Sequence, residues 1–448
     1  MNGGTMKKKT EKRFSRKSLA ILLTVACVGL SLYPTQAATA KKIQITYWTH
    51  EEPINQDFEN ILIKEFEAKN PTIKVNYLPV SEGDIITKLA TSLAAGGGPD
   101  VVNLIRRAMP QLASKGLLSA VDFTQMESVY GAKFAGAKKG QAKFNSLYES
   151  KIQKAYVWDG KQVGIPHEVN AYAMYGNKTM LAKAGVTKLP ETWDELISMC
   201  SAVNAANPGA ETLVLPLNIS SQLYLVFDQM VRAAGSSPMS QDGKKPNLDT
   251  PEVVKVLTLW RDLIKKHHCI DPNLGPAAGM VAEEVFTDQK AALFQTAGAW
   301  YVKTMKDGYP DLYKNYTVGN LPKFKATDKP TGGAIYSYGL LVPQASKHKD
   351  AAWRFATYLA AQGQRSFDTV GVWYGDKATF TSAATQKSEN WSVFRDSINN
   401  GVFLPTVVGY IQWITLVRGM VESVILGSVA PEQAVKDAQL AAIKLLYS

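Results

Sequence analysis

Two groups of residues have types and spacing that could support chemistry. The first is His267, His268 and Cys269, all of which are metal-ligand types. Three consecutive residues point in different directions on a helix, so one ion cannot use all three. A solvated helix end, where histidine favours the negative end of the dipole, is the better interpretation. The sequence therefore predicts no metal site.

The second group consists of carboxylates. Glu51 with Glu52, or Glu51 with Glu168, could act as the acid–base pair of a glycoside hydrolase, but nothing in the sequence fixes their separation. The chain contains no G-x-S-x-G, P-loop or H-E-x-x-H motif. Residues 96–100, GGGPD, precede a predicted strand and so cannot form a phosphate loop between a strand and a helix. We therefore expect no enzyme and no cofactor.

The elements around these residues alternate between strands and helices. Ile43, Ile45 and Tyr47 alternate as in a strand, and hydrophobic residues recur at helical spacing over residues 58–66. The pattern repeats with strands near 73–77 and 101–105 and a helix near 85–93. This β-α-β-α-β order predicts a mostly parallel sheet with right-handed crossovers. Ligands bind beyond the carboxyl ends of such strands, in the loops at 48–52 and 103–107.

The rest of the chain continues this alternation. Thr192 and Glu195 have the spacing of a capping box at a helix start. Trp193, Trp260 and Trp353 lie on the hydrophobic faces of predicted helices, so we expect them in the core. The other predicted elements are a hairpin turn at 158–161, a helix at 253–266, short strands at 291–294 and 335–342, a helix at 349–361 and a helical final hundred residues.

The first forty residues have the features of a secretory signal peptide. Residues 6–17 are basic, residues 19–33 are hydrophobic, and an A-x-A pattern ends at Ala40. The hydrophobic run is short for a membrane span, which needs about 20 residues. Cleavage near Ala40 is preferred to an uncleaved anchor. It is also preferred to lipid attachment at Cys27, which lies inside the hydrophobic run rather than after it.

Length, charge and cysteine content narrow the protein class. A chain of 448 residues predicts two to three domains. The net charge of +11 suggests a nucleic-acid partner, but residues 1–40 carry seven basic residues and one glutamate, so about +5 remains in the mature chain. We therefore expect no nucleic-acid binding. Cys200 and Cys269 could pair in an oxidising compartment or remain buried free thiols.

Several segments, in this order and spacing, resemble one known family. The chain resembles the family 1 extracellular solute-binding proteins, the sugar-binding, maltose-binding-protein-like components of ATP-binding-cassette importers. The match covers nearly the whole mature chain. The segments are ITYWTHEE, EFEAKNPTIKVNY, KLATSLAAGGGPDVVNL, VGIPHEVNAYAMYGNKTMLAKAGV, LPETWDEL, AALFQTAGAWYV, GLLVPQASKHKDAAWRFATYLA and APEQAVKDAQLAAI.

The resemblance implies an α/β, two-lobed periplasmic-binding-protein fold of type II. Each lobe is then a mainly parallel sheet flanked by helices, with the ligand in the cleft between them. After a signal peptide at 1–40, the N-terminal lobe would comprise 41–166 plus 332–363. The C-terminal lobe would comprise 167–331 plus 364–448. The chain would cross between lobes near 164–170, 331–334 and 362–364, and these crossings would act as a hinge.

The resemblance also implies a set of ligand-binding residues. Sugar rings stack on aromatic side chains, and their hydroxyls need carboxylate, amide and imidazole partners. Arg106 and Arg107 depart from a neutral-sugar site, because a guanidinium in the cleft could hold a carboxylate or phosphate. Solvation of these side chains at the surface is the preferred interpretation. The implied residues are Trp48, His50, Glu51, Arg106, His167, Glu168, Asn170, Trp300, Tyr338, Trp373, Tyr374 and Trp413.

The function implied by the resemblance is capture of a carbohydrate and its delivery to the permease of an ATP-binding-cassette importer. The protein would be a non-catalytic monomer, exported to the periplasm. One alternative is an anionic solute, such as a glycerol-phosphate diester or a sugar acid, bound in the same fold. The other alternative is a glycan-processing enzyme.

Overall fold

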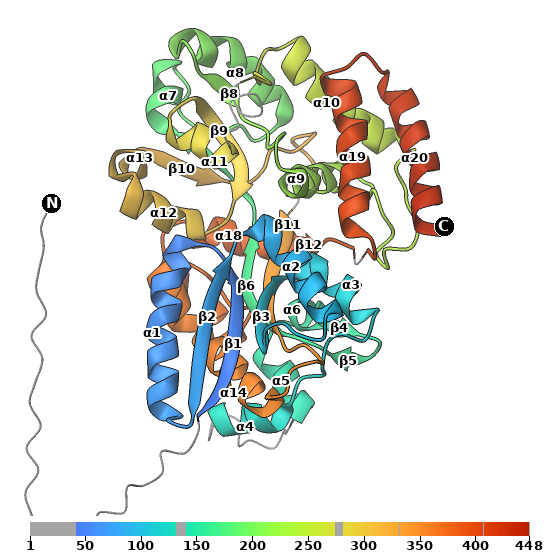
Figure 1. The fold of residues 1–448 in the computed structure, drawn as a ribbon. Coiled ribbons are helices and arrows are strands. Elements are labelled where there is room, and N and C mark those ends of the chain that lie inside the picture. The colour runs from blue at the N-terminus through green and yellow to red at the C-terminus, as the bar shows by residue number, and fades with distance from the viewer. Residues whose placement is uncertain (1–41, 131–139, 274–280, 331, 406, 448) are drawn as a thin grey trace, which may run out of the picture. The chain divides into compact units, whose positions relative to one another are not determined.

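The computed structural model describes residues 42–130, 140–273, 281–330, 332–405 and 407–447. The predicted signal peptide and Cys27 lie outside these residues. The described chain is α/β, with two main sheets (Figure 1).

The first sheet has six strands. Its order is β12-β11-β3-β1-β2, and β6 also pairs with β11. Strand β1 runs parallel to β2 and β3, as predicted, whereas β11 runs antiparallel to β3 and β6. The strands are β1 (Ile43–His50), β2 (Ile73–Val80), β3 (Val101–Ile105), β6 (Ile165–Ala171), β11 (Ala334–Leu341) and β12 (Val402–Phe403).

Helices cover both faces of this sheet. Leu340 packs into one hydrophobic cluster with α1 and α14, and its neighbour Leu341 packs into another with α2 and α3, because successive side chains point to opposite faces. All five residues of β3 are buried, as expected for a strand covered on both sides. The helices are α1 (Pro53–Lys69), α2 (Glu82–Ala94), α3 (Met109–Ala113), α4 (Phe123–Tyr130), α5 (Gly140–Leu147), α6 (Ser150–Lys154) and α14 (Lys349–Ala360).

The second sheet has four strands in the order β10-β7-β9-β8. Strand β7 runs antiparallel to β9 and β10, and only β8 and β9 are parallel, so the expectation of a mainly parallel sheet is wrong here. The strands are β7 (Ala173–Asn177), β8 (Glu211–Leu213), β9 (Ala291–Ala297) and β10 (Tyr316–Gly319). A short hairpin of β4 (Val157–Trp158) and β5 (Lys161–Gln162) stands apart from both sheets.

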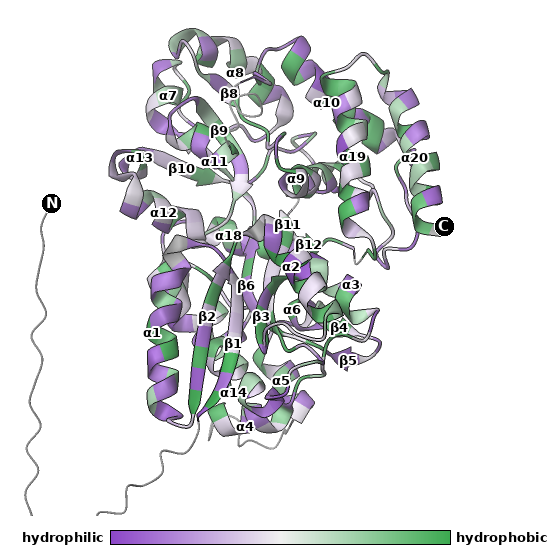
Figure 2. Cartoon of the chain, in the orientation of Figure 1, coloured by the Kyte–Doolittle hydropathy of each residue, from purple (hydrophilic) through white to green (hydrophobic). Residues whose placement is uncertain are grey.

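Helices of the second half form a large hydrophobic core that contains Trp193, Trp260 and Trp413. In Figure 2 hydrophobic and hydrophilic residues alternate along α19 and α20, as amphipathic helices require. The helices of this core are α7 (Lys178–Lys183), α8 (Trp193–Ala206), α9 (Ser220–Ala234), α10 (Pro251–Lys265), α19 (Tyr410–Ile425) and α20 (Pro431–Tyr447). Helices α11 (Ala282–Thr287), α12 (Trp300–Gly308) and α13 (Pro310–Lys314) pack instead into the cluster that includes α2 and α3.

Two local predictions can be checked in α8. The Thr192 side chain accepts a hydrogen bond from the Glu195 backbone N–H at 3.2 Å, and the Glu195 carboxylate accepts one from the Glu191 backbone at 2.7 Å. The predicted helix start is therefore confirmed. Cys200 of α8 and Cys269, which follows α10, form a disulfide, so pairing replaces the alternative of free thiols.

The chain passes from the first sheet to the second at Tyr172, between β6 and β7. It is back in the first sheet by Ala334 of β11. Strand β12 still pairs with β11, so the chain stays with the first sheet beyond the expected crossing at 362–364. Between them lie α15 (Gly363–Val370), α16 (Lys377–Thr381), α17 (Ala383–Gln386) and α18 (Trp391–Asn400). The lobe boundaries stay a prediction.

Candidate ligand-binding site

A cavity of about 620 Å³ is lined by residues from both sheets and from the crossing segment. Its size is within the usual range for small-molecule sites. One wall comes from the end of β1, the start of α1, β6 and β11, and the other from α9, α11, β9 and α12. The lining includes charged, polar and aromatic side chains, among them His50, Glu51, Glu52, Asn55, Arg107, Glu168, Asn170, Tyr172, Gln222, Glu283, Glu284, Trp300, Tyr309, Tyr336 and Tyr338.

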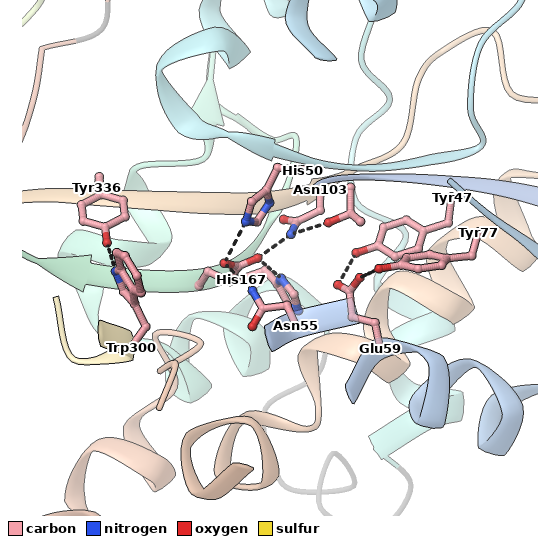
Figure 3. Close-up of polar contacts among 11 residues, drawn as sticks. Tyr47, His50, Asn55, Glu59, Tyr77, Asn103, His167, Trp300 and Tyr336 are labelled. Carbon is pink, nitrogen blue, oxygen red and sulfur yellow. Dashed lines mark hydrogen bonds and ion pairs between the residues drawn. The ribbon is translucent and has the colours of Figure 1, made fainter. Parts of the chain in front are cut away.

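Glu168 is the centre of a buried polar network on the first wall. Figure 3 labels His50, Asn55, Asn103 and His167, the side chains around its carboxylate. Its carboxylate accepts hydrogen bonds from Asn103 Nδ2 at 2.6 Å and from Asn55 Nδ2 at 3.3 Å. The imidazoles of His50 and His167 approach it at 3.5 and 3.6 Å. Side chains from β1, β3, α1 and β6 therefore meet at one carboxylate, beside the crossing between sheets.

This network keeps Glu168 ionised although it is buried. Burial by itself would raise the pKa of Glu168, but the charge of His50 and the contacts with His167 and Asn103 hold the pKa below its ordinary value. A buried carboxylate with several donors is a fixed hydrogen-bond acceptor. Since Glu168 lines the cavity, this acceptor is available to a ligand hydroxyl or ammonium.

A second buried carboxylate lies deeper in the first half of the chain. Glu59 of α1 accepts hydrogen bonds from the hydroxyls of Tyr47 at 2.7 Å and Tyr77 at 2.8 Å. Burial raises the pKa of Glu59, although the nearby His167 and both hydroxyls oppose the rise. Glu59 does not line the cavity. By bonding Tyr47 of β1 and Tyr77 of β2, it stabilises the end of the sheet that carries His50.

Aromatic rings complete the cavity wall. Trp300 begins α12 directly after β9, is partly exposed, and donates its indole N–H to the Tyr336 hydroxyl at 2.6 Å (Figure 3). Tyr338 stacks on His50 with ring centroids 4.0 Å apart. Rings held in this way offer flat hydrophobic faces next to the polar network, the combination that a sugar ring requires.

Half of the predicted binding residues line this cavity. They are His50, Glu51, Glu168, Asn170, Trp300 and Tyr338. His167 does not line it; it lies against Glu168, 2% exposed, with its ring 4.0 Å from that of Tyr374. Trp48 is half-buried and packs against a core cluster instead.

The other four predicted residues lie away from the cavity. Arg106 donates to the carbonyls of Ala155 at 3.0 Å and Leu404 at 2.7 Å, so its guanidinium braces the backbone. Trp373 and Trp413 are 1% and 0% exposed and belong to core clusters. Tyr374, 2% exposed, is also in the core. Burial in the core leaves these rings no surface to offer a ligand.

Sequence reasoning missed several lining residues. Asn55 is near the start of α1, next to the predicted loop, and that position was the signal that could have found it. Gln222 of α9 and Glu283 of α11 lie within helical patterns that carry no such signal, because their approach to the cavity depends on tertiary packing.

Among the residues that the structure describes, no group of three or more His, Cys, Asp or Glu side chains could hold a metal ion. Within the same residues, no helix combines the length and the hydropathy needed to cross a membrane. His267 and His268 accordingly join no metal-ligand cluster in the described chain.

Several curated relatives of this chain are sugar-binding proteins by name. It is 27% identical over 316 residues to the diacetylchitobiose binding protein DasA of Streptomyces coelicolor, which covers 69% of this chain and 68% of the relative. It is 25% identical over 346 residues to the multiple sugar-binding protein of Streptococcus mutans, covering 74% of each chain.

Solved structures share the fold at low identity. The GacH receptor of Streptomyces glaucescens, described unliganded and with acarbose, has a TM-score of 0.77 at 20% identity and covers 91% of this chain and 99% of its own. A solute binding protein of Thermotoga lettingae, bound with α-D-tagatose, has a TM-score of 0.77 at 22% identity and covers 90% and 100%.

These neighbours confirm the two-lobed periplasmic-binding-protein fold. The sequence profile of one family, described as bacterial extracellular solute-binding protein, matches residues 50–366, which is well over half of the chain. The chain therefore belongs to the family of bacterial extracellular solute-binding proteins.

Proposed function

We propose that this protein captures a carbohydrate in the cavity between its two sheets and delivers it to the permease of an ATP-binding-cassette importer. The observation that carries the proposal is the pairing of rings and fixed polar groups on one cavity wall. Trp300 and Tyr338 offer ring faces, and Glu168, His50 and Asn170 offer hydrogen-bonding groups.

The relatives support a carbohydrate as the ligand. Their names specify diacetylchitobiose, arabinooligosaccharide and multiple sugars. Structural neighbours were solved with acarbose, tagatose and cycloalternan. These ligands differ in size and linkage, so they support the class of ligand rather than one sugar.

We further infer that the protein binds its ligand without converting it, and that it acts as a monomer outside the cytoplasm. Membership of an extracellular solute-binding family supports export. A cleaved signal peptide predicts a mature amino terminus near Lys41, which intact-mass analysis of the exported protein would detect. A first residue of lipid-modified Cys27 would contradict that cleavage.

A thermal-shift screen of the purified mature protein against mono- and oligosaccharides tests the proposal. A ligand that binds only the native state raises the melting temperature. We expect at least one carbohydrate to do so and to be recovered unchanged by chromatography. A panel without any shift would contradict carbohydrate capture, and release of cleavage products would contradict a purely binding role.

A further inference from the structure

The charges on the cavity wall are mostly negative. Five glutamates line it, and the lining cations are Arg107 and, when protonated, His50. The Arg107 guanidinium lies 5.8 Å from the centre of the Tyr410 ring, where a cation–π contact engages it. An anionic solute would therefore enter a field of its own sign. The glutamates are Glu51, Glu52, Glu168, Glu283 and Glu284.

The first wall also leaves a hydrogen-bond acceptor unused. Because Glu168 is ionised, the groups that face it must be donors, which fixes the Asn55 amide with its nitrogen toward the carboxylate. Asn55 Oδ1 therefore points away from Glu168 as an acceptor, and it has no hydrogen-bond partner among the described residues.

The second wall repeats this arrangement. Gln222 Nε2 donates to Glu283 Oε1 at 3.2 Å, which leaves Gln222 Oε1 and Glu283 Oε2 as acceptors. Neither atom has a hydrogen-bond partner in the part of the chain that the structure describes. Burial raises the pKa of Glu283 to about 7, although contacts with its own backbone, Gln222 and Thr296 oppose the rise, and a neighbouring cation would favour the charged form further.

We propose that the cavity selects a carbohydrate bearing a protonated amine, an amino sugar, and that Glu283 is a specificity-determining residue for it. The inference rests on the proposed function and names its substrate class. An ammonium brings three donors and a positive charge to walls that present acceptors and carboxylates. An N-acetyl group replaces the charge with a carbonyl acceptor, and a sugar acid adds a negative charge, so both fit less well.

Matched sugars test this selection. Isothermal titration would compare the binding of glucosamine, glucose and N-acetylglucosamine, which differ only at position 2. The β-1,4-linked disaccharides of these three sugars form a second matched series, and glucuronic acid represents the sugar acids. We expect the amine form to bind about tenfold more tightly than the hydroxyl or acetamide form, as a charge-assisted contact allows. Glucuronic acid should bind most weakly.

The variant Glu283→Gln removes one charge and keeps an oxygen for Gln222. We expect the preference for the amine to fall to within about threefold, because the charge-assisted contact is lost. Glu127→Gln is the matched control, since Glu127 is exposed on α4 and does not line the cavity. It should keep the tenfold preference.

Several results would overturn the inference. Equal or tighter binding of the acetamide, hydroxyl or acid form would do so, as would an unchanged preference in Glu283→Gln. If other carbohydrates bind but none of this series does, the inference fails while the proposed function stands. If no carbohydrate binds at all, both fail.

Discussion

Glu168 has a left-handed backbone conformation, with φ of 54°, which residues other than glycine seldom adopt. Such a conformation is costly and persists where surrounding contacts fix it. Here Asn103, Asn55 and the two histidines hold the carboxylate, next to the point where the chain leaves the first sheet. The protein thereby holds an ionised acceptor in place before any ligand arrives.

Asn103→Ala should lower the free energy of unfolding at pH 7 by about 1–3 kcal/mol, because a buried carboxylate loses a donor. The folded pKa of Glu168 lies below its unfolded value, so its ionised form stabilises the fold above about pH 4.5 and this contribution is lost as the pH falls through the folded pKa. The cost of the variant should therefore shrink in acid.

Denaturant unfolding of wild type and Asn103→Ala at pH 7 and near pH 3 measures this. The same cost at both pH values would show that the asparagine acts through packing and not through the charge of Glu168.

Trp300→Ala should weaken carbohydrate binding by about 1–4 kcal/mol, the range for an aromatic residue at the centre of a binding site. The fold should survive, since Trp300 is only half-buried. Trp158→Ala provides the control, because Trp158 is similarly half-buried in β4 but does not line the cavity. Titration gives the affinities and denaturation gives the stabilities. Unchanged affinity with a large stability loss would remove Trp300 from the site.

At this scale the sequence predicted positions at strand ends better than positions within helices. His50 and Glu168 lie where the alternating pattern and the family resemblance put them. Trp413 was expected at the ligand, yet it lies in the core against Tyr224, with ring centroids 6.1 Å apart. Which face of a helix meets the cavity depends on the packing of distant elements, which residue types do not reveal.

Among the elements, the strands and helices of the first sheet follow the predicted order because their hydrophobic periodicity is strong. The second sheet differs, since β7 pairs antiparallel with β9 although the 113 residues 178–290 lie between these two strands. Strand direction depends on such long-range pairing, which local periodicity does not encode.

 The pairing of β7 with β9, across the long segment that contains α7 to α11, therefore could not be predicted from the sequence.

The disulfide joins α8 to the segment that follows α10, across a sequence separation of 69 residues. Replacing Cys200 and Cys269 by alanine should lower the free energy of unfolding by about 4 kcal/mol, the chain-entropy value for a loop of this length. Denaturant unfolding under non-reducing conditions measures the loss. Adding reductant to the wild type should reproduce it, and adding reductant to the double variant should change nothing. Equal stability of the two proteins would contradict a structural disulfide.

For the whole molecule, we expect closure of the two lobes on the ligand, because a cleft ligand binds best when both walls contribute contacts. Small-angle scattering of the mature protein should show a smaller radius of gyration at saturating carbohydrate. Trp300→Ala at the same sugar concentration, below its own saturation, should compact less. An unchanged radius in the saturated wild type would argue against a hinge.

At the scale of the whole chain, the order of the family segments predicted the fold, since residues 50–366 match the family and solved structures share the fold. The boundaries of the two lobes are harder to predict from the sequence than the fold is. Strand β12 returns to the first sheet at residues 402–403, and a two-residue strand has too little pattern to be recognised.

The most direct test of carbohydrate capture between the sheets is a crystal structure of the mature protein with the tightest-binding sugar from the thermal-shift panel. We predict sugar density in the cavity, with a ring face against Trp300 and a hydroxyl or ammonium within hydrogen-bond distance of Glu168. Density at any other place, with this cavity empty at saturating sugar, would contradict the account.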